Sequence, residues 1–68
     1  MTLIEKLVKN IDERRLGMNL SVDNLARKAE IPYSTLHNIR QKKVKDISLK
    51  TTLAIARALN CTVEELIE

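Results

Sequence analysis

The sequence is poor in the residues that build disulfides, metal sites and catalytic centres. It has one cysteine, Cys61, one histidine, His37, and neither phenylalanine nor tryptophan. A lone cysteine cannot form an internal disulfide, which favours a reducing cytoplasm, and one cysteine with one histidine is too few for a zinc site. We therefore expect no metal, no cofactor and no small-molecule ligand. Since the chain also lacks a nucleophile–base pair and paired carboxylates, we expect no enzymatic activity.

Long apolar runs are missing as well. No stretch approaches the roughly 18 apolar residues of a membrane span, and no secretory signal opens the chain, so we expect a cytoplasmic protein. Sixty-eight residues predict one domain, 1–68, and a hydrophobic fraction of 44% predicts that it folds. Without large aromatic residues, the core must be filled by Leu, Ile, Val and Ala, which suits short helices packed at close range.

Positive charge is concentrated in one part of the sequence. The segment from Arg27 to Arg57 carries eight basic and two acidic residues, a net +6, whereas the rest carries four basic and seven acidic residues, a net −3. Such a segment can face the phosphates of a nucleic acid, or it can be a solvated region that keeps a small protein soluble. Charge alone does not decide between these interpretations.

Capping signals predict five helices. Thr2 with Glu5, and Thr62 with Glu65, have the spacing of a capping box, and Ser21 and Ser48 are good N-caps. The first helix, with an apolar stripe that includes Leu3, ends at a left-handed residue, either Gly17 or Asn19. The second helix has a narrow inward face that includes Ala26 and Ala29. The third runs from about residue 33 to 41, the fourth carries Leu49 and Leu53 and stops at Asn60, and the fifth is short.

The third helix carries the pattern that points to function. At 100° per residue, Leu36 and Ile39 define its buried side, and the opposite arc is polar and free of acids. A neutral polar face beside lysines suits the major groove of duplex DNA, with the polar side chains on base edges and the lysines on phosphates. The arc consists of Ser34, His37, Asn38 and Gln41, with Tyr33 at its edge.

The sequence also resembles a known family. The run Leu20-Ser21-x-x-x-Leu25-Ala26-x-x-Ala29-x-Ile31-x-x-Ser34-Thr35-Leu36-x-x-Ile39 is followed by Ser48-Leu49-x-Thr51-x-Leu53-x-Ile55-Ala56-x-Ala58-Leu59 and Thr62-Val63-x-Glu65-Leu66. Over residues 20–68 these motifs resemble the Cro/C1-type (lambda-repressor-like, XRE family) helix-turn-helix proteins. The resemblance implies an all-α fold of five helices, in which the second and third form the helix-turn-helix.

The resemblance further implies a DNA-binding regulator, usually a repressor from a bacterium or phage and often a homodimer on two half-sites. An antitoxin-like protein-interaction module on the same fold is the alternative. Carried over by position, the base-reading residues are Tyr33, Ser34, His37 and Asn38. The residues expected on phosphates are Ser21, Thr35, Gln41, Lys42, Lys43 and Lys45.

Four positions depart from the family pattern. Glu30 stands where the turn commonly has Gly, Pro32 replaces the usual Ser or Thr cap of the third helix, and Val22 replaces a polar residue that touches phosphate. Arg40 stands where an acid is frequent, so that an internal ion pair is either reversed or absent. Three roles also stay open. Tyr33 contacts DNA or only covers the turn, and His37 is a base reader or a bystander at the groove edge. Leu66 with Ile67 closes the core or forms a patch for a two-fold partner.

Overall fold

The computed structural model describes residues 2–43 and 47–68, and over those residues it contains five α-helices and no strand. This confirms the predicted all-α fold. The helices are α1 (Leu3–Gly17), α2 (Val22–Ala29), α3 (Tyr33–Arg40), α4 (Leu49–Ala58) and α5 (Val63–Ile67).

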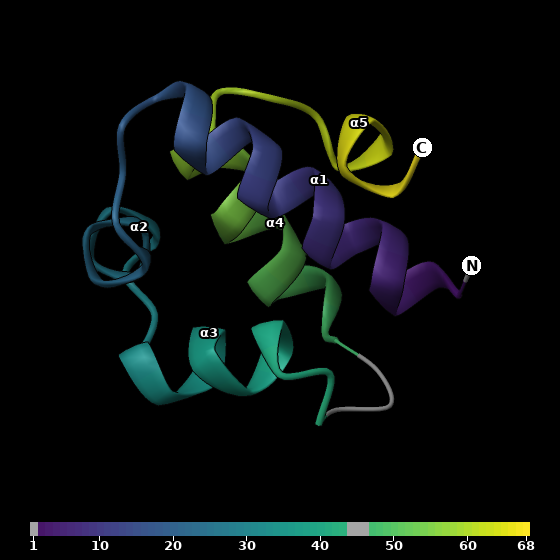
Figure 1. Cartoon of the computed structure of the whole chain (residues 1–68), viewed down its shortest axis with the longest axis horizontal. Coiled ribbons are helices and arrows are strands. Elements are labelled where there is room, and N and C mark those ends of the chain that lie inside the picture. The colour runs from purple at the N-terminus through teal and green to yellow at the C-terminus, as the bar shows by residue number, and fades with distance from the viewer. Residues whose placement is uncertain (1, 44–46) are drawn as a thin grey trace.

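The helices enclose one core. α1 packs against α5 and also touches α3, while α2 packs against both α3 and α4, and α4 packs against α5 (Figure 1). The core is aliphatic, as the scarcity of aromatic residues predicts. Its buried apolar residues are Leu7, Val8, Ile11, Leu25, Ala26, Ala29, Leu36, Ile39, Ile55, Ala56, Ala58, Leu59 and Leu66.

Four helices begin at the caps that the sequence predicts. The hydroxyls of Ser21 and Ser48 accept the third amide of α2 and α4, at 3.0 and 3.1 Å. Thr2 and Thr62 form full capping boxes at the starts of α1 and α5. The backbone amide of each threonine, and then its hydroxyl, lowers the pKa of the partner carboxyl, Glu5 or Glu65.

Four helices also end alike, at a residue with positive φ. These residues are Asn19, Glu30, Lys42 and Asn60, with φ between 55° and 59°. In each case the next amide donates to the carbonyl five residues back, at 3.0 or 3.1 Å, which is the Schellman pattern. Of the two candidates for the end of α1, Asn19 is therefore the left-handed residue, and Gly17 is helical.

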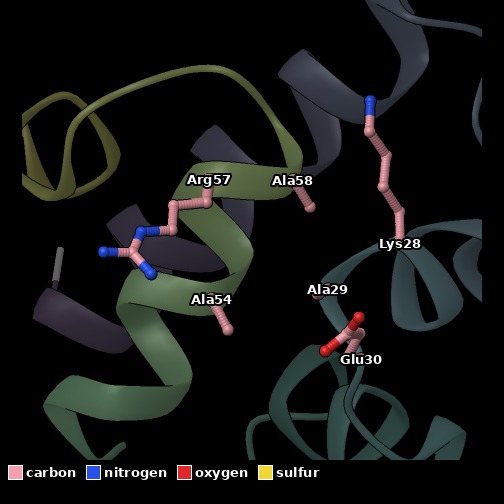
Figure 2. Close-up of a pocket in the computed structure, with 6 residues that line it drawn as sticks. All are labelled: Lys28, Ala29, Glu30, Ala54, Arg57 and Ala58. Atoms are coloured by element: carbon pink, nitrogen blue, oxygen red, sulfur yellow. The ribbon is translucent and has the colours of Figure 1, made fainter.

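The contact between α2 and α4 is made by small side chains. Ala29 at the end of α2 is buried, and the methyl groups of Ala54 and Ala58 on α4 point toward it (Figure 2). Alanine at these positions lets the two helices approach closely, as the narrow inward face of α2 predicts.

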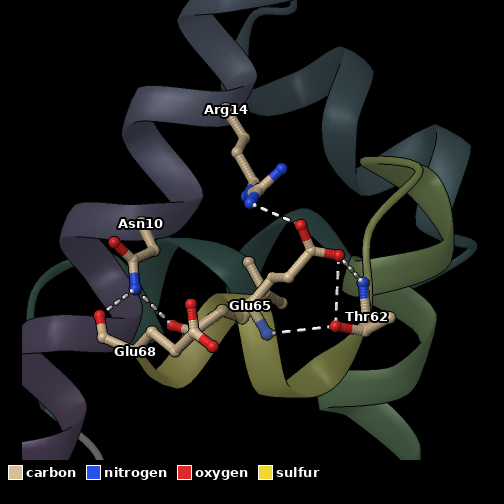
Figure 3. Close-up of polar contacts among 6 residues, drawn as sticks. Asn10, Arg14, Thr62, Glu65 and Glu68 are labelled. Atoms are coloured by element: carbon tan, nitrogen blue, oxygen red, sulfur yellow. Dashed lines mark hydrogen bonds and ion pairs between the residues drawn. The ribbon is translucent and has the colours of Figure 1, made fainter.

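Polar contacts hold α5 against α1 (Figure 3). The side-chain amide of Asn10 donates to the carbonyl oxygens of Leu66, at 2.7 Å, and Glu68, at 3.0 Å, so it satisfies acceptors at the end of α5. The guanidinium of Arg14 forms an ion pair with Glu65 at 3.1 Å. These contacts set the position of α5 on the first helix.

Several large apolar side chains predicted on helical stripes remain on the surface. Leu3 is 59% exposed and Leu49 is 73% exposed, and each is the first residue of its helix, where the stripe extends beyond the packed core. Leu66 is fully buried, whereas Ile67 is 38% exposed. Of the two roles considered for this pair, Leu66 closes the core and Ile67 contributes to the surface.

Candidate nucleic-acid interface

α2 and α3 are joined by a turn of three residues, Glu30, Ile31 and Pro32. Glu30 has φ 59° and ψ 41°, so it adopts the left-handed conformation that glycine adopts without steric cost. Ile31 packs against the core and its amide donates to Ala26 at 3.0 Å. The turn therefore keeps the Schellman geometry without the glycine that is common there.

Pro32 caps α3 without a side-chain hydrogen bond. Its φ of −60° and ψ of 142° still direct the chain into the helix, and its carbonyl accepts from the amides of Thr35 and Leu36. Among the described residues, the amides of Tyr33 and Ser34 have no backbone acceptor. The start of α3 therefore presents free N–H groups, which favour a nearby negative charge.

α3 has one buried side and one open side. Leu36 and Ile39 are 0% and 2% exposed, as predicted. Helical geometry places the five residues of the polar arc on the other side, and four of them are exposed while His37 is half-buried. We call this arc the reading face; it consists of Tyr33, Ser34, His37, Asn38 and Gln41.

Tyr33 and His37 form an aromatic pair at one edge of the reading face. Their ring centroids lie 5.9 Å apart and the ring planes meet at 23°, a stacked arrangement. The two residues are one helical turn apart, so stacking restricts the rotamers of both side chains. Ser34 and Asn38 lie on the rest of the reading face, and both are exposed.

Ser21 and Thr35, both predicted on phosphates, differ in their exposure to solvent. The exposed Ser21 hydroxyl accepts the Asn24 amide at 3.0 Å, which leaves its O–H free to donate. Thr35 is half-buried and lies between the reading face and the buried Ile39 on the helix. Both are at the borders of the surface that α3 presents, Ser21 at the start of α2 and Thr35 on the side of α3.

Basic residues follow α3 directly. Lys42 and Lys43 are exposed, and neither forms an ion pair with a described residue. The charge of Lys42 nevertheless acts on Glu5: after the hydrogen bonds from Thr2, it is one of the influences that lower the pKa of this carboxyl. Lys45, predicted on phosphate, lies outside the described residues.

Asp12 on α1 holds the end of α3. Its carboxylate accepts from Nε and Nη2 of Arg40, at 3.0 and 3.3 Å, and from Arg15, at 3.3 and 3.4 Å. Arg15 also donates to the carbonyl of Leu20 at 2.9 Å, so the same residue holds the α1–α2 connection against α1. The bond to Asp12 raises the pKa of Arg40. Arg40 therefore has an acidic partner on α1, so the ion pair is present, with the base on α3.

The part played by Asp12 and Arg15 is not predicted by the sequence analysis. The two residues are three apart on a helix, which suggests only a surface ion pair between them. The contact to Arg40 joins residues 28 positions apart in the sequence. Only the resemblance signalled it, by pointing to an ion pair at position 40.

Comparison with known families decides the identity of this helix-turn-helix. The family model described as the Cro/C1-type HTH DNA-binding domain matches residues 10–68. The chain belongs to the Cro/C1-type helix-turn-helix family. The match supports DNA binding, and it covers the helix-turn-helix together with α4 and α5. No curated protein and no solved structure matches the chain significantly.

The described part of this Cro/C1-type domain shows neither a metal-binding cluster nor a membrane-spanning helix. Residues 2–43 and 47–68 contain no group of three or more His, Cys, Asp and Glu side chains that could hold a metal ion. No helix among them is long and apolar enough to cross a membrane. Cys61 is half-buried against the core, and burial raises the pKa of its thiol. It acts as a small apolar residue.

Proposed function

We propose that this chain is a transcriptional regulator that binds duplex DNA sequence-specifically and represses by occupying its site. In this proposal Tyr33, Ser34, His37 and Asn38 contact base edges in the major groove. The phosphate contacts come from residues that flank them: Ser21, Thr35, Gln41, Lys42, Lys43 and Lys45. Repression, and an origin in a bacterium or phage, rest on the resemblance to the family.

The observation that carries the proposal is the reading face itself. It is neutral and polar, four of its five residues are exposed, and it lies on a helix whose opposite side buries Leu36 and Ile39. Lys42 and Lys43 follow it, and neither forms an ion pair with a described residue. Arg40 and Asp12 fix the far end of the same helix on α1. A helix held in this way can present its polar side chains to base edges in one orientation, which sequence-specific binding requires.

The proposal separates affinity from sequence preference, and the two are tested by different substitutions. Bound sequences are first selected from a random duplex pool. Lys43→Ala is then expected to weaken binding to all duplexes and to lower the slope of log K against log salt by about 0.9. Asn38→Ala is expected to relax preference at one position of the site, at a cost of about 1–3 kcal/mol.

Lys9→Ala is the matched control for Lys43→Ala, because Lys9 is exposed and lies on α1, outside the helix-turn-helix. It should leave both the affinity and the salt slope unchanged. Duplex binding that does not depend on salt, or that tolerates Lys43→Ala and Asn38→Ala alike, would contradict the proposal.

We also propose that the regulator acts as a homodimer. A shallow apolar groove of about 200 Å³ crosses the ends of three helices, and its lining includes Leu3 of α1, Leu49 of α4 and Ile67 of α5. We call it the apolar face. Three of the six large apolar side chains that are exposed among the described residues line this face. They carry no charge, so the face favours an apolar partner over a polar one. A second copy of the same face is the partner it suits.

The dimer is tested on a palindromic duplex that contains two half-sites. Leu49→Ser is expected to abolish cooperative binding of two copies while affinity for a single half-site stays within about twofold. Leu16→Ser is the control, because Leu16 is 62% exposed but does not line the apolar face. Equal loss of cooperativity in both variants would contradict the assignment of this face.

A further inference from the structure

A second groove lies between α2 and α4, apart from the surfaces described above. It consists of two adjoining hollows of about 310 and 450 Å³, which share Ala29, Glu30, Ala54 and Arg57. Its floor is apolar: besides the alanines it includes Ile31, which is half-buried. We call it the α2–α4 groove.

Leu53 adds a large exposed aliphatic side chain to the apolar floor of the α2–α4 groove. It lines the larger hollow, and it is 38% exposed although it is a large aliphatic residue in the second turn of α4. Of the six large apolar residues exposed among the described ones, three lie in the apolar face and Tyr33 lies on the reading face. Leu16 and Leu53 belong to neither surface, and of these two Leu53 lines the α2–α4 groove.

The rims of the groove are basic. Lys28 lies on the α2 side, and Lys50 and Arg57 lie on the α4 side. In the close-up, the side chain of Arg57 extends away from Ala29 and Glu30, and that of Lys28 extends upward from the end of α2, so both cations lie at the outer margin of the floor (Figure 2). None of the three cations forms an ion pair with a described residue. Glu30 is the one acid in the lining, so the groove carries three positive charges against one negative.

The combination of floor and rim favours a protein segment over a phosphate backbone. Phosphates need cations but gain nothing from Leu53, and Glu30 would repel them from the middle of the groove. A protein segment can place an apolar side chain on the floor and carboxylates on both rims. No residue of the reading face or of the apolar face lines this groove.

We propose that the α2–α4 groove binds an acidic protein segment that carries an apolar anchor residue. The anchor packs on Leu53, Ala54 and Ile31. Its flanking carboxylates pair with Lys28 on one rim and with Lys50 and Arg57 on the other. The role is separate from DNA binding and stands whether or not the reading face contacts bases as proposed above.

The test is a selection of linear peptides from a displayed random library on the full chain. The counter-bait is the double variant Lys50→Glu with Arg57→Gln, which removes the cations of the α4 rim. The control bait, Lys6→Glu with Lys9→Gln, has the same change in charge at two exposed positions of α1. Circular dichroism of all three baits checks that each is folded.

Peptides enriched on the wild type are expected to carry several acids around a large apolar residue, and to be enriched equally on the α1 control. The synthesised consensus peptide is expected to bind the groove variant about tenfold more weakly than the wild type. Leu53→Ser is expected to weaken it several-fold without any change in charge.

Three results would overturn the proposal. The first is that no peptide distinguishes the wild type from the groove variant. The second is that the α1 control loses the peptide equally, which would show attraction by net charge alone. The third is that the groove variant weakens duplex binding as much as Lys43→Ala does, which would assign Lys50 and Arg57 to phosphate contact instead. Normal duplex binding by the wild type in the same series shows separately whether the DNA-binding proposal holds.

Discussion

Replacing Glu30 by glycine should stabilise the fold. Glu30 has φ 59° and ψ 41°, and an L-residue in this conformation costs about 1–2 kcal/mol through crowding of its Cβ. Glycine has no Cβ but loses more freedom on folding, which offsets about 0.5–1 kcal/mol of the gain. We therefore expect Glu30→Gly to raise the free energy of unfolding by about 0.5–1 kcal/mol.

Thermal unfolding followed by circular dichroism measures this effect. In a domain of this size, 1 kcal/mol shifts Tm by about 4–8 °C, so a rise of about 2–8 °C is expected. Affinity for the selected duplex should stay within about twofold, because the turn already has the geometry that glycine favours.

Glu30→Ala is the control that separates charge from conformation. It removes the same carboxylate but keeps the Cβ, so its Tm should stay close to that of the wild type. If the glycine and alanine variants are equally stable, the left-handed conformation at Glu30 carries no cost of the size argued here.

Three further predictions follow from particular contacts. A double-mutant cycle of Asp12→Ala and Arg40→Ala, measured by urea unfolding, should give a coupling free energy of about 1 kcal/mol. The pair has two hydrogen bonds, but both side chains are 28% exposed, which limits the coupling. Additive effects of the two substitutions would contradict this prediction. Gly17→Ala should raise stability by about 0.5–1 kcal/mol in the same assay, because Gly17 is helical and an added Cβ meets nothing within 4 Å; a loss of stability would contradict this. Because the pKa of Glu65 is lowered in the folded state, its contribution to stability is present above the ordinary carboxyl pKa and is lost as pH falls through the lowered value. Thr62→Val should flatten this pH dependence of the free energy of unfolding, measured by urea titrations below about pH 5. An unchanged pH dependence in the variant would refute the prediction.

Local features of the fold could be predicted from the sequence because their causes are local. A capping box needs only Thr62 and Glu65 at a spacing of three, and the buried side of α3 needs only Leu36 and Ile39 at a spacing of three. These signals act within one helical turn. The start of α5 and the buried side of α3 are therefore confirmed at the level of single residues, whereas Leu3, Leu49 and Leu53 of the predicted apolar stripes are exposed.

Features that join distant parts of the chain could not be predicted in the same way. No local rule connects Asp12 to Arg40, or the side chain of Asn10 to the end of α5. Local signals also left open the choice between Gly17 and Asn19, and the left-handed residue is Asn19 although glycine has the greater conformational freedom. For the candidate site, the sequence predicts which residues share the reading face, but it does not reveal the Tyr33–His37 stack or how α1 holds α3.

The apolar face is too small to hold two copies together without DNA. Full burial of an aliphatic side chain is worth about 1.5–3 kcal/mol, so covering the exposed fractions of Leu3, Leu49 and Ile67 would contribute on the order of 3 kcal/mol per copy. The two copies together would gain on the order of 6 kcal/mol, whereas association costs about 4–15 kcal/mol in lost freedom, so little or no net stabilisation remains. The proposed dimer should therefore be weak in solution and form on the duplex, where adjacent half-sites have already brought the two copies together. Sedimentation should show a monomer at micromolar concentration and two copies on a palindromic duplex. A dimer that persists at nanomolar concentration without DNA would mean that the interface extends well beyond these three side chains.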